Sequence, residues 1–286
     1  MKKDKHRYRH IGIDNRAKRI FNQKSGRAVI VPMDHGVSVG PIDGITDMEE
    51  AINGISESEA DAVIVHKGCV AEGSSKNRKF DLGLIVHLSA STDMFNPLCK
   101  QLICTVEEAL RLGADGVSIH INFGNDFESR MLDQLGKVGE QSRLWGMPLL
   151  VMAYVRGSVI TKLENEIEDK DILSLEKAKL VKIAARAVYE LGASIIKIPY
   201  TGDIKSFREI TESCPVPVVV AGGPRMDTDE EILQMVFDSV VAGGSGTSIG
   251  RNIFQHESPE RMIRAISAIV HNQASVEVAK KFLELS

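Results

Sequence analysis

Short apolar runs recur along the chain, and polar stretches with helical periodicity separate most of them. The runs are rich in Val and Ile and lack the polar alternation of a half-exposed strand, a pattern typical of strands covered on both faces. We therefore predict eight buried strands, at Ala28–Met33, Ala62–His66, Leu84–Leu88, Gly116–His120, Leu149–Ala153, Ile195–Ile198, Val218–Ala221 and Thr247–Ile249.

The intervening stretches carry helix start and stop signals. Asp47, Thr105 and Ser174 are predicted N-caps, and glutamates three residues after Thr105 and Thr228 give capping-box spacing. Glycines stand where helices should stop, at positions 113, 146, 192 and 243. The predicted helices are Asp47–Ser58, Thr105–Leu112, Phe127–Leu144, Ser174–Leu191 and Thr228–Ala242.

This alternation of strand and helix predicts a (β/α)8 TIM barrel. The alternative is a doubly wound open sheet, but no Gly-rich dinucleotide turn follows Met33. We expect residues 1–25 to be a leading segment and residues 26–286 to be a single barrel domain, closed by a helix from Glu257 onward.

Composition narrows the class of protein. The 286 residues are 43% hydrophobic and 26% charged, and the net charge of −4 gives no reason to expect nucleic acid or an anionic membrane as partner. Four cysteines without metal-ligand spacing fit a reducing cytosol, and no apolar run reaches the roughly 18 residues that span a bilayer. The basic start, Met1–His10, is interpreted as a solvated arm, or alternatively as an arm that packs on a neighbouring subunit.

One predicted strand contains a lysine. Lys197 lies between Ile196 and Ile198, and burial there would lower the pKa of its amine. A neutral amine near pH 7 is the nucleophile that Schiff-base chemistry on a ketone requires. Taken alone, the stretch is more typical of a lysine that snorkels from a strand end or pairs with a carboxylate.

Further polar residues follow the predicted strands, where TIM barrels place their chemistry. Asp34 is either a cap or a proton carrier, and Tyr154 either packs its ring or exchanges a proton with substrate. Gly222-Gly223 is either a tight turn or, with Gly250-Arg251, a phosphate-binding pair of loops. Too many site-type residues gather at this one face to be only caps and solvated ends.

Two other features have more than one interpretation. His66, His87 and His120 close neighbouring strands and could ligate a divalent metal, but no carboxylate or Cys at metal spacing accompanies them. Hydrogen-bonded core or rim histidines are the favoured interpretation. The charged segment 161–171 is interpreted as a solvated loop or helix start, with a lid over the site as the alternative.

Six motifs together resemble one family. They are MDHGVSVGP, SIHINFG, MAYVRG, KIPYTGD, VVVAGGP and GRNIFQ, and they resemble, in order, the motif set of the archaeal-type class I fructose-bisphosphate aldolases. That family also contains 2-amino-3,7-dideoxy-D-threo-hept-6-ulosonate synthase, whose branch makes an early precursor of aromatic amino acids. Met152 stands where the fructose-bisphosphate aldolases carry Trp, so the chain looks more like the heptulosonate synthase branch.

The resemblance implies a role for each matching residue. It implies that Lys197 is the Schiff-base lysine, Asp34 a proton acceptor and Tyr154 a proton donor. It further implies a substrate lining of His35, Gly36, Val37, Ser38, Val155 and Arg156, and a phosphate site of Gly222, Gly223, Gly250 and Arg251.

The resulting hypothesis is a metal-independent class I aldolase that acts on a ketose phosphate, by cleavage or by aldol transfer, without a cofactor. The resemblance implies a homo-oligomer, often a decamer, that binds a small sugar phosphate, and the cysteine content places it in the cytoplasm. The alternatives are a metal-dependent aldolase or hydrolase that uses the three histidines, and a non-catalytic barrel that binds a phosphate ligand. The sequence leaves the acceptor aldehyde and the oligomeric state undetermined.

Overall fold

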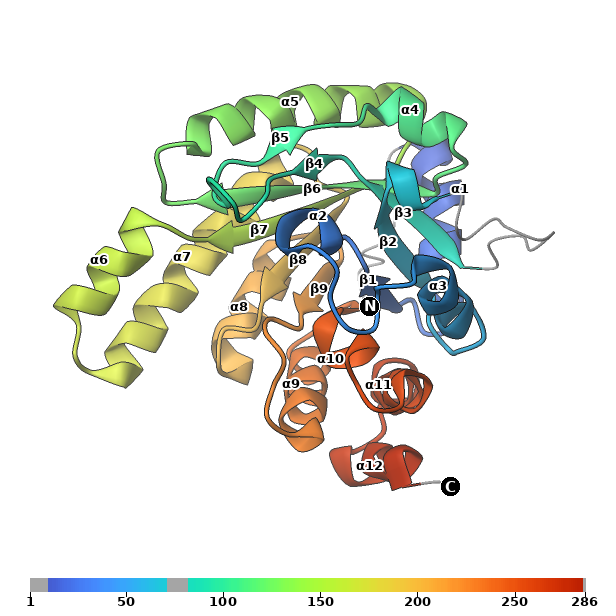
Figure 1. The fold of residues 1–286 in the computed structure, drawn as a ribbon. Coiled ribbons are helices and arrows are strands. Elements are labelled where there is room, and N and C mark those ends of the chain that lie inside the picture. The colour runs from blue at the N-terminus through green and yellow to red at the C-terminus, as the bar shows by residue number, and fades with distance from the viewer. Residues whose placement is uncertain (1–9, 71–81, 285–286) are drawn as a thin grey trace.

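The computed structural model describes residues 10–70 and 82–284, and its central feature is a closed barrel of eight parallel strands (Figure 1). Around the ring the strands follow the order β1-β10-β9-β8-β7-β6-β3-β2. They are β1 (Ala28–Pro32), β2 (Ala62–His66), β3 (Gly83–His87), β6 (Gly116–Phe123), β7 (Leu149–Val155), β8 (Ile195–Pro199), β9 (Val218–Ala221) and β10 (Gly246–Ser248). The predicted (β/α)8 barrel is confirmed.

The ring closes where the first and last strands meet, with Val29 opposite Thr247. Inside the barrel a cluster of apolar side chains is buried almost completely, including Ile30, Ile64, Ile85 and Val219. A second apolar layer fills the space between the strands and the surrounding helices. Both faces of every strand are therefore covered, which explains the continuous apolar runs in the sequence.

Two strands run at least two residues further than predicted. β6 continues to Phe123 and β7 to Val155, and the two strands stay paired in register as far as Phe123 and Val155. Tyr154 therefore lies on β7 rather than in the loop after it. A small antiparallel hairpin, β4 (Ser89–Ala90) with β5 (Gln101–Leu102), follows β3 and was not predicted.

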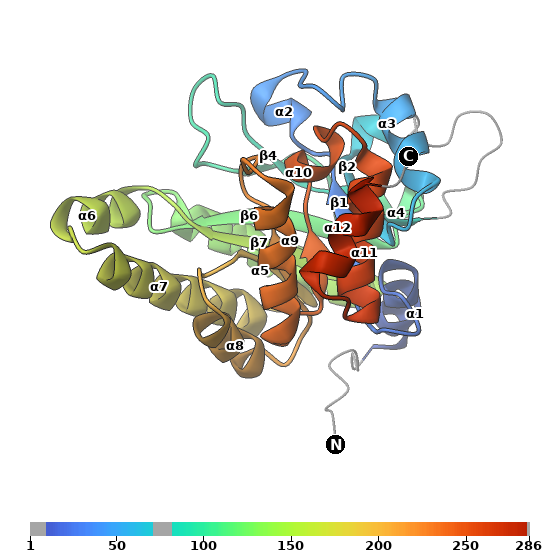
Figure 2. The same cartoon turned by 90° about the horizontal axis from the view of Figure 1, so that it is seen from below.

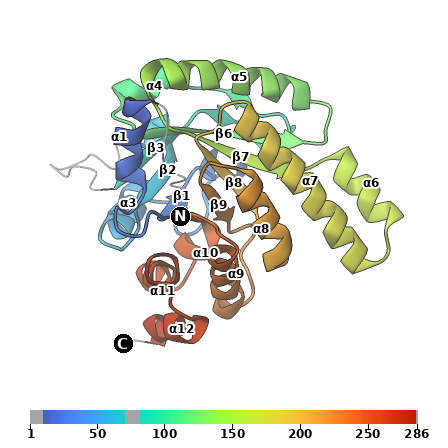
Figure 3. The ribbon, with the colours of Figure 1, turned by 180° about the vertical axis from the view of Figure 1, so that it is seen from behind.

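Helices surround the strands, as the view from behind shows (Figure 3). Their bounds are α1 (Ile11–Ile20), α2 (Gly36–Val39), α3 (Met48–Ser56), α4 (Val106–Arg111), α5 (Glu128–Trp145), α6 (Ser158–Glu166), α7 (Lys170–Glu190), α8 (Ile204–Ser213), α9 (Asp229–Val241), α10 (Arg251–Phe254), α11 (Pro259–Asn272) and α12 (Val276–Glu284), with a 3-10 turn η1 (Lys67–Cys69). None of the helices in the described ranges is long and apolar enough to cross a membrane.

The predicted caps are partly right. Asp47 and Thr105 accept hydrogen bonds from the amides of Glu50 and Glu108, and Thr228 forms a complete capping box with Glu231. These contacts satisfy amides that would otherwise lack partners.

The predicted cap Ser174 is wrong, because α7 begins at Lys170. Asp169 caps it by accepting from the amides of Asp171 and Ile172, and no helix breaker separates this cap from Ser174. The charged segment 161–171 thus forms the end of α6, a short link and the start of α7. These two helices project from the barrel together (Figure 1).

The amino-terminal end of the barrel is sealed by α1, which belongs to the predicted leading segment. Figure 2 shows α1 at the end of the barrel opposite α2. Ile20 is fully buried, and Gly83 lies so close that a Cβ there would be 2.5 Å from the carbonyl oxygen of Arg19. The prediction for Met1–His10 falls on residues that, apart from His10, lie outside the described ranges.

Two carboxylates organise this sealed end. Asp115 lies 2.7 Å from Arg19 Nε and accepts from the Leu84 amide at 3.0 Å. Asp61 accepts from the Val29 amide at 2.7 Å. Each buried carboxylate therefore has a partner that offsets its loss of water.

Candidate active site

The opposite, carboxyl-terminal end of the barrel opens into a cavity of about 360 Å³. In a TIM barrel this is the end where the βα loops converge. The side chains and backbone that line it come from nearly every strand: Pro32, Asp34, His35, Ser38, Val39, Asp93, Pro97, Lys100, His120, Met152, Tyr154, Arg156, Lys197, Gly222, Gly223, Pro224, Ser248, Gly250 and Arg251.

Lys197 lies in the wall of this cavity, on β8 between Met152 of β7 and Val219 of β9. Its side chain is buried, with 5% of its surface exposed. Within the described ranges no group is hydrogen-bonded or ion-paired to its amine. Burial lowers the pKa of Lys197 to about 8, although Asp34 acts in the opposite direction. A substantial fraction of the amine is therefore neutral near physiological pH.

Asp34 follows β1 and faces two imidazoles. Its carboxylate oxygens lie 3.7 Å from His35 Nδ1 and 3.7 Å from His87 Nε2. Burial acts to raise the pKa of Asp34, but the fields of His87, His35 and Lys197 outweigh it and hold that pKa well below its usual range. Burial also lowers the pKa of His87 to about 3. At neutral pH Asp34 is thus a carboxylate beside a neutral His87.

Tyr154 is stacked between two neighbours. The Arg156 guanidinium lies 4.5 Å above its ring centroid, and the His120 ring lies 4.9 Å away. Burial raises the pKa of Tyr154 to about 12, so the phenol keeps its proton over the whole neutral range. Within the described ranges no protein group is hydrogen-bonded to its hydroxyl. A neutral phenol that faces a cavity can donate a proton to a ligand there.

The loops after β9 and β10 meet at the cavity rim. Gly222 packs against Ile249 so tightly that a Cβ would lie 2.7 Å from its side chain, and Gly223 has φ +67°, which favours glycine. Arg251 donates to the Gly223 carbonyl at 2.9 Å, while its buried Nε has no partner in the described ranges. Backbone and guanidinium donors therefore converge on one side of the mouth.

Asn252 fixes these two loops to each other, and sequence reasoning gave it no role. Its amide donates to the carbonyls of Gly222 and Pro224 at 3.1 and 2.9 Å and accepts from the Met226 amide at 2.7 Å. The motif GRNIFQ contains the residue, but its sequence offered no sign of partners some 28 positions away.

Sequence reasoning also missed Lys100, Asp93, His120 and Ser248 as lining residues. Lys100 and Asp93 belong to the long connection between β4 and β5, which no periodic pattern marks. Conversely, Gly36 and Val37 lie exposed on α2 away from the cavity, and Val155 lines a neighbouring cavity with Tyr154 and Lys177. Arg225, which follows Pro224 in the loop after β9, does not line the cavity either.

Two of the three histidines are hydrogen-bonded to other side chains. His87 is hydrogen-bonded to Ser118 at 2.7 Å, and His120 is hydrogen-bonded to Asn122 at 2.9 Å. His66 packs edge to face on His87. Within the described ranges no group of three or more His, Cys, Asp or Glu is placed to hold a metal ion. The metal-dependent alternative therefore has no ligand set in that part of the chain.

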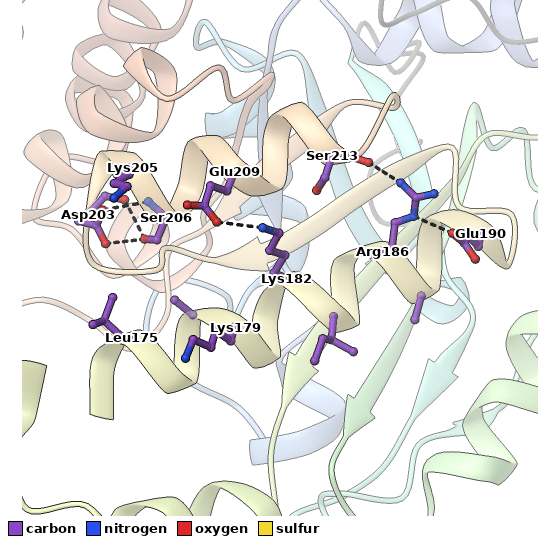
Figure 4. Close-up of a pocket in the computed structure, with 13 residues that line it drawn as sticks. Leu175, Lys179, Lys182, Arg186, Glu190, Asp203, Lys205, Ser206, Glu209 and Ser213 are labelled. Carbon is purple, nitrogen blue, oxygen red and sulfur yellow. Dashed lines mark hydrogen bonds and ion pairs between the residues drawn. The ribbon is translucent and has the colours of Figure 1, made fainter. Parts of the chain in front are cut away.

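A larger cavity, of about 800 Å³, lies outside the barrel between α7 and α8. Figure 4 shows contacts between the two helices, from Lys182 to Glu209 and from Arg186 to Ser213, and an ion pair between Arg186 and Glu190 within α7. Apolar residues such as Leu175, Ala178 and Ile183 make up much of the remaining lining. None of the candidate site residues lines this cavity.

Comparison with known proteins decides the family. A profile of the DeoC/LacD family aldolases matches residues 28–256. The chain belongs to the DeoC/LacD aldolase family. It is a class I aldolase, as the resemblance of its motifs indicated.

Individual members of this aldolase family align over almost the whole chain. It is 39% identical over 273 residues to 2-amino-3,7-dideoxy-D-threo-hept-6-ulosonate synthase 1 of Archaeoglobus fulgidus, covering 95% of this chain and 96% of that one. It is 34% identical over 268 residues to 2-amino-4,5-dihydroxy-6-oxo-7-(phosphonooxy)heptanoate synthase of Streptomyces griseus, covering 93% and 92%.

A solved structure of an archaeal fructose-1,6-bisphosphate aldolase superposes with a TM-score of 0.78 at 28% identity. It covers 91% of this chain and 99% of its own. In that structure the catalytic Lys is covalently bound to the carbinolamine intermediate of the substrate.

Proposed function

We propose that Lys197 is the Schiff-base nucleophile of this aldolase, with Tyr154 as proton donor and Asp34 as proton acceptor. The observation that carries the proposal is a buried lysine, unpaired within the described ranges, in the same cavity as a neutral phenol and an ionised carboxylate. Burial of that amine keeps it reactive, and the other two groups have opposite protonation states, as acid and base steps require.

The proposed reaction begins when neutral Lys197 adds to the C2 ketone of dihydroxyacetone phosphate. The carbinolamine loses water to give an iminium, and loss of a C3 proton gives an enamine. Asp34 accepts protons in these steps because it is ionised and lies at the same cavity wall. The iminium nitrogen withdraws electrons from C3, which makes that proton acidic.

The enamine carbon then attacks the carbonyl carbon of an aldehyde, forming the carbon–carbon bond. Tyr154 donates a proton to the oxygen that was the aldehyde carbonyl, and water hydrolyses the iminium to release the product ketone. In the reverse direction Tyr154 would take the proton from that hydroxyl and the bond would break. One cavity can thus support both cleavage and transfer.

The phosphate of the ketose is proposed to bind at Gly222, Gly223, Gly250 and Arg251. The unpartnered Nε of Arg251 and the glycine backbone supply donors without side chains that would block approach. Asn252 keeps the two loops together. Fixing the phosphate there holds the ketone against Lys197 on the neighbouring β8.

We propose aldol transfer of the heptulosonate synthase type as the physiological reaction. The more similar relatives carry synthase names at 39% and 34% identity, whereas the fructose-1,6-bisphosphate aldolase is 28% identical. Met152 lines the cavity beside Lys197, where the sequence resemblance placed the departure from fructose-bisphosphate aldolases. Cleavage of fructose 1,6-bisphosphate is the second candidate, favoured by the shared fold.

The remaining expectations extend this proposal. We propose that residues 26–286 act as one catalytic domain, with α1 of the leading segment sealing its base, and that the protein works in the cytoplasm.

We also propose a homo-oligomer, because α7 exposes Ile172, Leu175 and Ile183, with 51%, 56% and 64% of their surfaces accessible. Light scattering of the purified chain would show whether it is larger than a monomer.

Reductive trapping tests the proposed nucleophile. Borohydride added with dihydroxyacetone phosphate should leave a stable adduct on the peptide that contains Lys197. Lys67→Met is the matched control, because Lys67 is already paired with Glu108 at 3.1 Å. The control should label as the wild type does, and Lys197→Met should not. An adduct on another lysine, or none, would contradict the proposal.

A further inference from the structure

Two histidines flank the carboxylate of Asp34, and no step proposed so far involves either of them. Oδ1 of Asp34 lies 3.7 Å from Nδ1 of His35, and Oδ2 lies 3.7 Å from Nε2 of His87. The same type of side chain is therefore placed twice at the same distance from the proposed proton acceptor. The surroundings of the two imidazoles differ, and this difference assigns them different roles.

His87 is almost completely enclosed, with 4% of its side chain exposed. Its Nδ1 is hydrogen-bonded at 2.7 Å to Oγ of Ser118, which is fully buried. Within the described ranges the Ser118 hydroxyl has no other acceptor, so it donates to this nitrogen. The proton of the neutral ring is then on Nε2, which faces Asp34. Because burial lowers the pKa of His87 to about 3, the ring does not take up a second proton at neutral pH.

His35 connects the same carboxylate to solvent. Its Nδ1 is buried and makes no hydrogen bond within the described ranges, while 26% of the side chain is exposed. Its Nε2 also lacks a hydrogen-bond partner there, but this atom is not buried and is therefore open to water. One ring nitrogen thus faces Asp34 and the other faces solvent. A histidine placed in this way can take up a proton at one nitrogen and release one from the other.

Packing holds the His35 ring in this orientation. Gly250 lies so close that a Cβ there would be 2.7 Å from Cε1 of His35. The ring of Phe254 meets the imidazole edge to face, with the two centroids 5.3 Å apart. The backbone is fixed as well, because the His35 carbonyl accepts from the amides of Ser38 and Val39 in α2. Nδ1 therefore stays directed at the carboxylate.

We infer that His35 carries protons between Asp34 and solvent, and that His87 is a positioning residue for the same carboxylate. This inference rests on the proposed function, because it supplies an exit for the proton that Asp34 accepts. When the C3–H bond of the iminium breaks, its electron pair forms the C2–C3 double bond and the C2–N π pair moves onto nitrogen. The proton passes to Asp34 Oδ1 and then to His35 Nδ1, and the imidazolium releases its Nε2 proton to water or a buffer base.

Asp34 needs such an exit while substrate is bound. Only 14% of its side chain is exposed, and it lines the cavity that the substrate fills, so a bound ketose covers it. A proton that stays on Asp34 returns to the same carbon, whereas a proton that reaches solvent is replaced by one from the solvent. Exchange uses the path once in each direction and leaves His35 in its starting tautomer. The exchange rate therefore reports on the carrier.

The first test follows, by proton NMR in D2O, the exchange of the C3 hydrogen of dihydroxyacetone phosphate without an acceptor aldehyde. Glutamine can donate a hydrogen bond but cannot pass on a proton, so His35→Gln and His87→Gln are a matched pair. His35→Gln should slow the exchange about 10- to 100-fold, and His87→Gln should slow it less than about 5-fold. Borohydride trapping on Lys197 should stay within about 3-fold of the wild type in both, because iminium formation precedes loss of the C3 proton.

The second test replaces the missing ring with a small carrier. In His35→Ala, imidazole added to the buffer should raise the exchange rate in proportion to its concentration, by about 5-fold or more, because the vacated position opens to solvent. A purely structural defect would not respond to imidazole. His256→Ala is the control, because His256 lies 3.2 Å from Asp229 and does not line the cavity. Its exchange rate should match the wild type with and without imidazole.

The outcomes separate this inference from the proposed function. Wild-type exchange in His35→Gln, equal losses in the two glutamine variants, or a His35→Ala protein that imidazole does not restore would each overturn the carrier. If His87→Gln does not fold, the imidazole response of His35→Ala decides. In all these cases borohydride trapping on Lys197 of the wild type leaves the aldolase proposal standing. Failure of that trapping would overturn both.

Discussion

The two ends of the barrel use charged residues in opposite ways. At the amino-terminal end Asp115 is paired with Arg19 and with the Leu84 amide, and the apolar residues of α1 cover the barrel interior. At the carboxyl-terminal end Lys197 is buried and Tyr154 is half-buried, and neither has a hydrogen-bond partner within the described ranges. Burial with a partner stabilises the fold, and burial without one perturbs a pKa.

This contrast separates residues that maintain the barrel from residues that are proposed to react. A paired charge has little free energy to gain from a ligand, whereas an unpaired one is stabilised when substrate supplies the missing partner. Changes at the two ends should therefore affect different measurements.

Removal of the amine should have the largest effect. Lys197→Met should lower kcat by at least about 10⁴-fold, because no iminium can form without the nucleophile. Steady-state turnover of dihydroxyacetone phosphate with an acceptor aldehyde would measure this loss of kcat. Lys67→Met serves as the control, and a Lys197→Met protein with more than a few per cent of wild-type turnover would contradict the assignment.

Loss of the phenol should have an intermediate effect. Tyr154→Phe should lower turnover by about 10²- to 10³-fold, the usual contribution of a positioned proton donor. Borohydride trapping of dihydroxyacetone phosphate should fall much less, because the proton that Tyr154 is proposed to donate belongs to the later bond-forming step. Equal losses in trapping and turnover would instead place Tyr154 in iminium formation.

The pH dependence should follow the amine. Because the pKa of Lys197 is about 8, the rate of trapping should rise about tenfold per pH unit below 8 and level off above it. The Asp34 carboxylate raises that pKa, so Asp34→Asn should move the midpoint to lower pH. A midpoint that stays in place, or moves up, would show that the two groups are not coupled in this way.

Stability should change in opposite directions at the two ends. The pKa of Lys197 is about 8 in the fold and about 10.5 when unfolded, so below pH 8 protonation favours the unfolded chain. Lys197→Met should therefore raise the free energy of unfolding by about 1–2 kcal/mol at pH 7, a gain that shrinks as the pH rises from 8 towards 10.5.

At the sealed end, Asp115→Ala should lower the free energy of unfolding by about 1–2 kcal/mol, because it leaves the Leu84 amide unpaired. Its kcat should stay within about twofold of the wild type. Denaturant unfolding of the Lys197→Met and Asp115→Ala proteins, with turnover measured on the same samples, would check both predictions. A loss of activity in Asp115→Ala while the protein remains folded would break the division between the two ends.

The fold was predictable because its signal is local. Each strand is a short apolar run, and caps such as Asp47 and Thr228 act on amides three residues away. The same locality explains the error at α7, where Asp169 and Ser174 are both acceptable caps by residue type. Only the backbone conformation around Asp169 decides between them.

The candidate site was predictable only where its residues adjoin strands. Lys197, Asp34 and Tyr154 lie on or next to apolar runs, so the barrel topology places them at one end. Lys100 and Asp93 lie in an irregular connection of the hairpin after β3, and nothing in their neighbours' sequence indicates that they turn back to the cavity. Whether residues of this connection reach the cavity depends on the fold of the whole chain rather than on a local sequence pattern.

Ring closure also has a consequence during synthesis. Because β1 pairs with β10, Asp34 and Arg251 become neighbours only when the last strand takes its place beside the first. A nascent chain that ends before residue 246 contains Lys197 but lacks Gly250 and Arg251, the second loop of the proposed phosphate site. The proposed substrate site is therefore complete only after nearly the whole polypeptide has been translated.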